Sequence, residues 1–277
     1  MLSLFLGATL WAQIALFTQS EQDTPTRIDW KENRLTLLSP RLPNGKTEVW
    51  YLEAFCRPGS TKREWEQSVI PHKTTRLDGE GAKGSLRLRT EVEGGVVLTH
   101  TIRVTKDGVR FDIHAENRGS QKAEVDWAQP CMQVADFTGR TQETYIERTF
   151  IFTNRKERQG LTLLSELPRN EEARYRGGQV FVPKEVNRDD VNPRPLSDTI
   201  PANGLIGCFS ADDKSILAMA WSDTQELFQG VIVCIHSDFR IGGLNSGEKK
   251  HLWGKIYLVP NDIPALLRRY RRDFGRR

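Results

Sequence analysis

The sequence predicts an all-β protein, a large antiparallel β-sandwich with a short C-terminal helix. The main observation is the segment 96–134, where apolar and polar residues alternate with a period of two in three consecutive runs. That period is typical of strands that bury one face. Segments 106–108 (Lys-Asp-Gly) and 117–120 (Asn-Arg-Gly-Ser) separate the runs, and each contains a residue that tolerates the positive φ of a tight hairpin. We therefore expect three consecutive antiparallel strands here.

Shorter apolar runs extend the predicted sheets on both sides of this segment. They indicate strands at residues 36–38, 48–55, 86–89, 145–153, 178–182, 205–209, 216–221, 230–235 and 252–259. Near the C-terminus, the spacing of Leu266, Leu267, Tyr270 and Phe274 predicts a short amphipathic helix. We expect that helix to pack its apolar side chains against the sandwich.

The length of 277 residues suits a single large all-β domain, and no internal repeat is present. The first twenty residues carry no charged side chain and are mostly apolar, which is typical of a signal peptide with cleavage after Ser20. We therefore expect a signal peptide (1–20), a linker (21–30) and a sandwich domain (31–277). The protein should be periplasmic or secreted, with no membrane span after signal cleavage. Because no Lys or Arg precedes the apolar run, an uncleaved anchor or a start codon assigned too late are the alternatives.

Charge is concentrated at the C-terminal end of the chain. The net charge is +4, and residues 267–277 hold six Arg and one Asp. Such a tail can contact nucleic acid or an anionic membrane, but here we expect the arginines to form the solvated face of the C-terminal helix. Basic and aromatic residues are not interleaved in the way that stacks bases, so nucleic acid is not an expected partner. The oligomeric state is left open by the sequence.

The four cysteines do not indicate a metal centre. Cys56, Cys131, Cys208 and Cys234 form no CxxC pair and lack metal-ligand spacing with the five histidines, so neither metal nor cofactor is expected. In an oxidising compartment they can pair in three ways, and Cys208 with Cys234 is the most plausible pair because both lie in late apolar strands. Small buried thiols are nevertheless favoured, since a domain of this size does not need disulfides.

Three short motifs together carry a resemblance to a known superfamily. They are residues 106–108, residues 116–120 (Glu-Asn-Arg-Gly-Ser), and residues 244–248 (Leu-Asn-Ser-Gly-Glu) leading into the apolar run 252–258. In this combination the chain resembles the galactose mutarotase-like β-supersandwich superfamily over residues 92–259. The resemblance implies a sugar-binding site on a concave sheet face.

The same resemblance bears on catalysis. Aldose epimerases of this fold need a general acid His on the strand after the Asn-x-x-Ser turn and a general base Glu late in the chain. Here residues 129–131 (Gln-Pro-Cys) and 234–236 (Cys-Ile-His) occupy those places, so the required His and Glu are absent. The resemblance therefore implies a sugar-binding scaffold without mutarotase activity.

A long irregular region, residues 57–77, carries the first group of candidate site residues. Arg57, Trp65 and His72 lie on it, and Glu53 lies just before it. Carbohydrate sites combine an aromatic plane with polar groups for hydroxyls, and these four residues supply both. In the alternative interpretation, Trp65 pins the loop to the sheet and His72 is a surface residue.

The second group of candidates lies late in the chain. His236 ends an apolar strand two residues before Asp238, where a general acid or base is expected; a structural His in a turn is the alternative. The remaining histidines, His100, His114 and His251, are expected to pack or face solvent. Oxygen-bearing residues of the region 140–203, namely Asp189, Asp190 and Asn192, resemble part of a calcium loop but lack the Gly and bidentate Glu of an EF-hand.

These observations predict an exported carbohydrate-binding protein that acts on a polysaccharide as a lyase or hydrolase. His72 or His236 would transfer the proton, with Glu53, Arg57, Trp65 and Asp238 in substrate binding. The alternative is a non-enzymatic module of the cell envelope whose long loops contact other proteins. An enzyme should gather a His with Glu53, Asp238 or an Arg in one cleft, whereas a binding module should expose tryptophans without a titratable pair.

Overall fold

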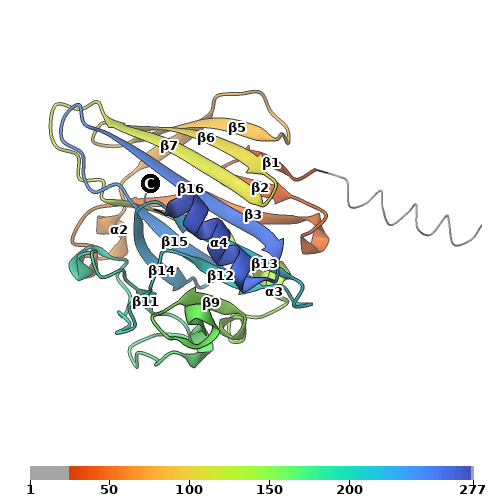
Figure 1. The fold of residues 1–277 in the computed structure, drawn as a ribbon. Coiled ribbons are helices and arrows are strands. Elements are labelled where there is room, and N and C mark those ends of the chain that lie inside the picture. Colours follow the sequence, from red (N-terminus) through yellow and green to blue (C-terminus); the bar gives the residue numbers. More distant parts are fainter. Residues whose placement is uncertain (1–24, 276–277) are drawn as a thin grey trace, which may run out of the picture.

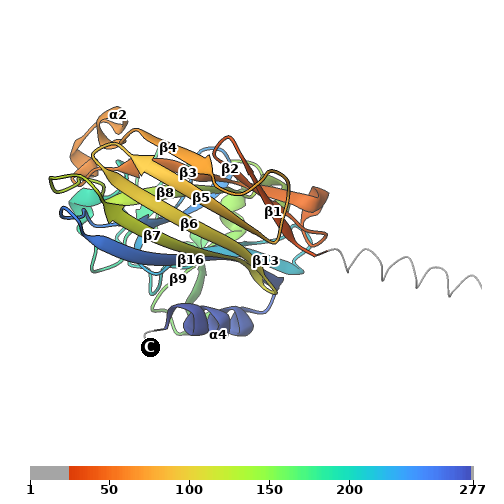
Figure 2. The ribbon, with the colours of Figure 1, turned by 90° about the horizontal axis from the view of Figure 1, so that it is seen from above.

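The computed structural model describes residues 25–275, which form two packed antiparallel sheets (Figures 1 and 2). The seven-stranded sheet has the order β1 (Arg27–Lys31), β2 (Arg34–Leu38), β3 (Lys46–Cys56), β8 (Trp127–Gln133), β15 (Cys234–Arg240), β14 (Thr224–Gln229) and β11 (Val180–Phe181). The nine-stranded sheet has the order β10 (Leu161–Leu163), β9 (Thr149–Phe152), β12 (Ile206–Phe209), β13 (Ser215–Trp221), β16 (Lys249–Pro260), β7 (Gly108–Asn117), β6 (Val96–Thr105), β5 (Ser85–Val92) and β4 (His72–Arg76). The predicted all-β class with large antiparallel sheets is confirmed.

Helical structure is sparse in the described residues. The α-helices are α2 (Trp65–Ser68), α3 (Ala135–Thr138) and α4 (Ile263–Phe274). Short 3-10 turns are η1 (Pro43–Gly45), η2 (Ser60–Lys62), η3 (Tyr145–Glu147), η4 (Glu157–Gly160), η5 (Leu164–Glu166) and η6 (Arg188–Asp190). Within residues 25–275, none of the helices is long and apolar enough to cross a bilayer. The expected signal peptide lies outside the described residues, and β1 begins at Arg27, inside the stretch expected to be a linker.

The main core lies between the two sheets and is built from the inward-facing residues of each strand. An aromatic group joins the layers: Tyr51 and Phe239 come from the seven-stranded sheet, and Phe111 and Trp221 from the nine-stranded sheet. Ring centroids are 5.1 Å apart for Tyr51 and Phe111, 5.2 Å for Phe111 and Trp221, and 4.6 Å for Trp221 and Phe239. Burying each such side chain contributes roughly 1.5–3 kcal/mol, so this group fixes the two sheets against each other.

The predicted hairpin at residues 106–108 joins β6 to β7 in register along their whole length. Gly108 has a φ of 140°, and a Cβ at this position would lie 1.9 Å from the carbonyl oxygen of Ile256 on β16. The turn therefore needs glycine both for its backbone angle and for the close approach of the neighbouring strand.

The third of the three expected strands does not continue this hairpin. Residues 127–133 form β8, which pairs with β3 and β15 in the other sheet. The buried side chain of Asn117 explains the crossing, because it donates to the carbonyls of Gln121 (2.8 Å) and Leu244 (2.9 Å) and accepts from the Gly119 amide (2.8 Å). These bonds stabilise an irregular connection that leads the chain away from β7.

A second difference concerns the predicted strand 230–235: residues 230–233 connect β14 to β15, and only residues 234 and 235 are extended, as the start of β15. Val233 has a positive φ of 53°, which breaks the extended conformation at this point. The preceding strand β14 was not predicted, because its buried residues Gln225, Glu226 and Gln229 obscure the usual apolar pattern.

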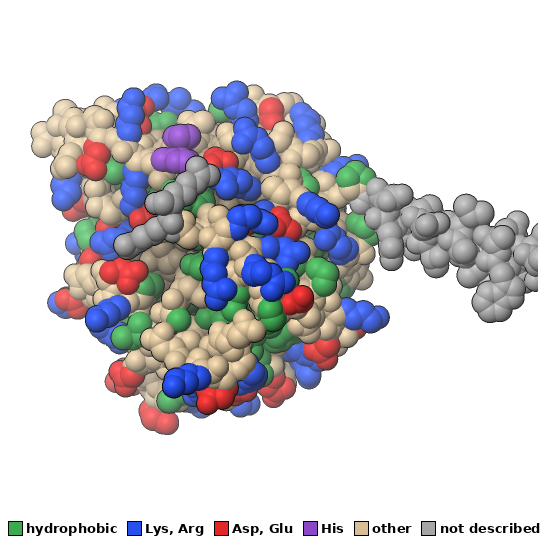
Figure 3. Space-filling view, in the orientation of Figure 1, with side chains coloured by type: hydrophobic (Ala, Val, Ile, Leu, Met, Phe, Trp, Pro, Cys, Tyr) green, Lys and Arg blue, Asp and Glu red, His purple; other side chains and the backbone are tan. Residues whose placement is uncertain are grey.

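The predicted C-terminal helix is confirmed as α4. Its buried Leu266 and Leu267, with the partly buried Tyr270 and Phe274, pack on the outer face of the nine-stranded sheet, as Figure 2 shows. The Asp262 side chain caps the helix by accepting from the Ala265 amide at 2.9 Å. Lys and Arg side chains gather over this helix and the adjoining sheet (Figure 3).

Candidate functional site

The outer face of the seven-stranded sheet carries a set of buried polar side chains. On β15, Cys234, His236 and Asp238 project outward, while the alternating Ile235 and Phe239 enter the main core. Neighbouring strands and one loop add further polar groups to the same face. We call Glu53, Gln129, Asn192, Glu226, His236 and Asp238 the polar cluster; all are buried except the half-buried Glu53.

Hydrogen bonds connect four residues of the polar cluster, which come from β3, β8, β14 and the loop that contains Asn192. The Gln129 amide donates to Glu53 Oε2 at 2.9 Å and accepts from Asn192 Nδ2 at 3.1 Å. The Asn192 backbone amide donates to the Glu226 carboxyl, at 2.9 Å to Oε2 and 3.1 Å to Oε1. The Arg194 Nε in turn donates to Asn192 Oδ1 at 3.0 Å. These bonds connect four members of the polar cluster in one network, beside which His236 and Asp238 lie on β15.

Two carboxyl groups lie at the centre of the polar cluster. Glu226 and Asp238 are opposite each other on β14 and β15, and both are fully buried. Burial, followed by the charge of Asp238, raises the pKa of Glu226 well above its usual value. Burial also raises the pKa of Asp238 to about 6. Ionising both of these adjacent carboxyls is unfavourable, so the raised pKa favours the neutral form of Glu226.

Neither Asp238 oxygen has a hydrogen-bond partner among the described residues, although both are buried. The His236 Nδ1 lies 3.7 Å from Asp238 Oδ1, and that nitrogen also lacks a hydrogen bond among the described residues. Buried polar groups in folded proteins are nearly always bonded to protein, water or ligand. The neutral form of Glu226 can donate its proton to one Asp238 oxygen, which leaves the other oxygen and His236 Nδ1 open to a partner that enters this site.

The imidazole of His236 packs against the ring of Phe228 and contacts the thiol of Cys234. Its imidazole stacks on Phe228, with centroids 4.1 Å apart and planes 6° apart, and the Arg194 guanidinium lies 5.0 Å from the Phe228 ring. Its Nε2 lies 3.3 Å from Cys234 Sγ. Burial opposes the charge of the imidazole, but Cys234 and Asp238 outweigh it and raise the pKa of His236 to about 10.

Cys131 on β8 completes this part of the site. Its hydrogen bond to Cys234, helped by His236, lowers the pKa of the Cys234 thiol to about 5, while the same contact and burial raise the pKa of Cys131. All four cysteines are free and buried. Cys208, the partner favoured from the sequence, lies in the core between the sheets, so the pair that the structure forms is Cys131 with Cys234.

A loop covers the polar cluster. We call residues 187–196 the cover segment; it includes η6 and supplies Asn192 and Arg194. It is fixed to the turn after Arg57 by the Gly59 amide, which donates to Asp190 Oδ1 at 2.7 Å, and by a 2.7 Å ion pair of Lys62 with Asp189. Figure 1 shows the two loops beside each other at one end of the sheet. The oxygens that resemble a calcium loop are thus engaged with protein groups.

The structure brings together three of the predicted site residues. Glu53, His236 and Asp238 all lie on the outer face of the seven-stranded sheet. Arg57 instead donates to the carbonyls of Gln67 and Val69 and pairs with Glu124 at 3.2 Å. It therefore stabilises the loop on which it lies.

Trp65 and His72 have no hydrogen bond to the polar cluster. Trp65 packs against Trp127 of β8, with ring centroids 6.5 Å apart, in a small apolar group on the outer face of the same sheet. His72 is on β4 of the other sheet, where it contacts the core residue Phe55 and hydrogen-bonds the Leu52 carbonyl at 3.2 Å. Burial lowers the pKa of His72. His100 is equally structural, buried between Tyr51 and Thr90.

Sequence reasoning missed Glu226 and the nearby Trp50, and it did not assign Gln129 or Asn192 to this site. Trp50 is half-buried on β3 opposite Cys131, and its buried Nε1 has no hydrogen-bond partner. The available signal was polar residues inside otherwise buried strands, as in residues 224–229. The positions where the resemblance places the epimerase acid and base, 129–131 and 234–236, both fall in this site.

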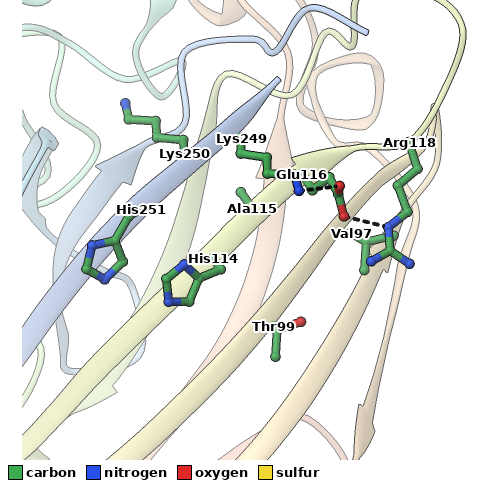
Figure 4. A pocket seen from close by; sticks show the side chains of 9 residues that line it. All are labelled: Val97, Thr99, His114, Ala115, Glu116, Arg118, Lys249, Lys250 and His251. Carbon is green, nitrogen blue, oxygen red and sulfur yellow. Dashed lines mark hydrogen bonds and ion pairs between the residues drawn. The ribbon is translucent and has the colours of Figure 1, made fainter. Parts of the chain in front are cut away.

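A second, shallow groove of about 430 Å³ lies on the outer face of the nine-stranded sheet (Figure 4). There His114 and His251 are cross-strand partners whose rings stack 4.6 Å apart. Glu116 pairs with Lys249 at 3.2 Å and with Arg118 at 2.8 Å, so this one carboxylate bridges two basic side chains of the groove.

No protein-family model matches the chain, and no curated protein matches it either. Solved structures of similar fold include a candidate aldose 1-epimerase from Escherichia coli K12 (10% identity, 84% of this chain, 98% of that chain, TM-score 0.43). Another is a galactose mutarotase-like protein from Lactobacillus casei (10% identity, 84% and 99%, TM-score 0.39). A third is the Slr1438 protein from Synechocystis (9% identity, 94% and 99%, TM-score 0.43). The predicted resemblance to galactose mutarotase-like proteins is thus confirmed as one of fold, and what the site does is read from its own residues.

Proposed function

We propose that this is an exported carbohydrate-binding protein whose site is the polar cluster together with Trp50. The observation that carries the proposal is the buried pair of Asp238 and His236, which keeps a carboxylate oxygen and Nδ1 open among amide, carboxyl and guanidinium groups. A sugar ring offers hydroxyls that both donate and accept, which matches such a mixed set. Trp50, opposite Cys131, adds an indole ring with an unpartnered Nε1–H donor, and the Arg34 guanidinium lies 4.7 Å from the centre of that ring.

The second part of the proposal is that the protein acts on the bound carbohydrate as a lyase or hydrolase. Glu226 is the proton donor, since burial and Asp238 keep it protonated near neutral pH. The Glu226 carboxyl lies in one site with Glu53, His236 and Asp238. Such a group of titratable side chains is typical of an enzyme and is not required of a non-enzymatic module of the cell envelope. In this structure the Asn192 backbone amide donates hydrogen bonds to the Glu226 carboxyl. The cover segment therefore has to shift before a substrate can reach Glu226.

Export rests on the uncharged apolar run of residues 1–20. Expressed with its own N-terminus in a Gram-negative host, the protein should lose about twenty residues, as signal-peptide lengths predict. Mass spectrometry of the purified product decides this, and a cytosolic product that keeps Met1 contradicts it.

Binding is tested by screening the purified protein on a glycan array and titrating the best glycan. Trp50→Ala should weaken that affinity by about 10- to 100-fold, as expected for an aromatic anchor. Trp65→Ala, a tryptophan on the loop rather than beside the cluster, is the matched control and should leave the affinity unchanged. No glycan bound by the wild type, or equal losses in both variants, contradicts the proposed site.

A further inference from the structure

Three soft metal-ligand atoms converge in the buried site, outside the carboxyl pair. The Sγ atoms of Cys131 and Cys234 and a ring nitrogen of His236 all lie within 4.8 Å of one another. We propose that Cys131, Cys234 and His236 bind a zinc ion, with a fourth position left for water or a ligand. No local sequence pattern indicates this site, because Cys131 on β8 is distant along the chain from Cys234 and His236 on β15.

The spacing of the ligand atoms fits zinc. Zn–S and Zn–N bonds are about 2.3 Å and 2.0–2.1 Å long, so the ligands of a tetrahedral ion lie roughly 3.3–3.8 Å from each other. His236 Nε2 is already 3.3 Å from Cys234 Sγ, and the two side chains point from the same face of β15. Thiolate and imidazole are also the donors that zinc prefers.

The other ring nitrogen of His236 supports the same assignment. A metal-bound histidine usually donates its second N–H to a carboxylate or carbonyl, which fixes the ring orientation. Here Nδ1 faces Asp238 Oδ1 at 3.7 Å and has no other partner among the described residues. Asp238 is therefore a positioning residue for the metal ligand, and its second oxygen stays available to a bound hydroxyl.

A disulfide between the two thiols fits less well. His236 lies opposite Cys131 in the pairing of β15 with β8, so Cys234 is the diagonal neighbour two residues away. Diagonal neighbours in an antiparallel pair have Cα atoms about 7–8 Å apart, whereas disulfides span about 4.4–6.8 Å. A metal ion bridges that gap without moving the backbone.

The backbone next to the ligands is shaped to leave room for them. A Cβ at Gly230 would lie 2.3 Å from Cys234 Sγ and 2.9 Å from His236 Nε2. The turn that follows, with Val231 and Ile232 exposed, connects the ligands to the surface within a few residues. The proposed ligands therefore lie close to the exposed turn of the β14–β15 hairpin.

The test measures metal binding in the absence of any sugar, so its result is independent of the proposed carbohydrate function. The purified full chain is stripped with a chelator under reducing conditions and titrated with Zn²⁺ and with Co²⁺, whose thiolate charge-transfer and d–d absorption bands report the ligand set. We expect one ion per chain by native mass spectrometry and a tetrahedral thiolate spectrum. Cys131→Ser and Cys234→Ser should abolish the thiolate band or reduce it strongly.

Cys56→Ser and Cys208→Ser are the matched controls, because both remove a buried thiol that lies outside the three-ligand group. Both should keep the cobalt spectrum. Asp238→Asn retains all three ligands and should weaken Zn²⁺ affinity by about 10- to 100-fold. A wild-type chain that binds no Zn²⁺ when reduced, a Cys131–Cys234 disulfide that persists in the reduced preparation, or equal loss in the Cys208 control would each overturn the proposal.

Discussion

The backbone amide of Gly59 donates a hydrogen bond to Asp190 Oδ1 at 2.7 Å, although the two residues are 131 positions apart in the chain. This bond joins the two long irregular regions that the sequence singled out. It also holds the cover segment over the polar cluster. The closed state of the site therefore depends on a contact outside the site itself.

Asp190→Ala should loosen the cover segment. The variant leaves the Gly59 amide without its acceptor and removes a carboxylate 3.8 Å from Arg240, so we expect a stability loss of about 1–2 kcal/mol and faster amide hydrogen exchange at residues 187–196. Asp189→Ala is the control, because its pair with Lys62 is exposed and surface pairs contribute about 0–1 kcal/mol. Equal exchange rates in the two variants would show that the bond between Gly59 and Asp190 does not hold the cover segment in place.

Trp65→Ala should act on stability rather than on carbohydrate affinity. Trp65 packs against the buried Trp127 and is half-buried, so truncation should cost about 1–3 kcal/mol and lower the melting temperature. Thermal melting and glycan titration of this variant separate the two roles. A normal melting temperature combined with weakened glycan binding would place Trp65 in the site after all.

Asp107 should make stability depend on pH in the acidic range. Burial opposes its ionisation, but Lys255 (2.6 Å) and Arg272 (3.0 Å) outweigh burial and lower the pKa of Asp107 to about 2. A carboxyl whose pKa is lower in the folded state stabilises the protein above its unfolded pKa near 3.9, and this contribution is lost as the pH falls from about 4 to 2.

Asp107→Asn should therefore cost about 1–2 kcal/mol at pH 7, after allowance for solvent screening of the group. It should also flatten the stability profile between pH 4 and 2, measured by urea unfolding. Because Arg272 lies on α4, the helix should become more sensitive to proteolysis in this variant. A parallel shift of the whole pH profile would contradict the assignment.

Gly108→Ala should destabilise the β6–β7 hairpin severely. The added Cβ would meet the Ile256 carbonyl at 1.9 Å and force β16 to move, in addition to the strain of the positive φ. Gly94→Ala is the matched control: its φ is also positive (94°), but nothing lies within 4 Å of the added atom. The control should lose about 1 kcal/mol, and a comparable loss in both variants would show that the close approach is unimportant.

The fold was largely predictable from the sequence, whereas the site was predictable only in part. The alternation in β6 and β7 identifies a hairpin because each strand buries one face. The change of sheet before β8 depends on hydrogen bonds from Asn117 to Leu244, 127 residues away, which no local pattern contains. Local reasoning therefore predicts strands better than it predicts which sheet they join.

The same limit explains the site. His236 and Asp238 were found because they are two residues apart on one strand, and Glu53 because it precedes a distinctive loop. Glu226 sits in a strand that lacks an apolar pattern, and the proximity of Cys131 to Cys234 arises only when β8 pairs with β15. The polar cluster forms because β3, β8, β15 and β14 are neighbours in one sheet, and a local sequence pattern does not determine which strands become neighbours.

The most direct test of the account is the turnover of the glycan selected on the array, compared between wild type and Glu226→Gln. The substitution keeps the size of the side chain and an acceptor for the Asn192 amide, but removes the transferable proton. We predict that kcat falls by at least about 100-fold, while Kd for the glycan stays within about threefold of the wild-type value, since buried neutral isosteres differ little in contact energy. Unchanged turnover in Glu226→Gln, or a wild-type protein that binds the glycan but never cleaves it, would contradict the catalytic role of the polar cluster.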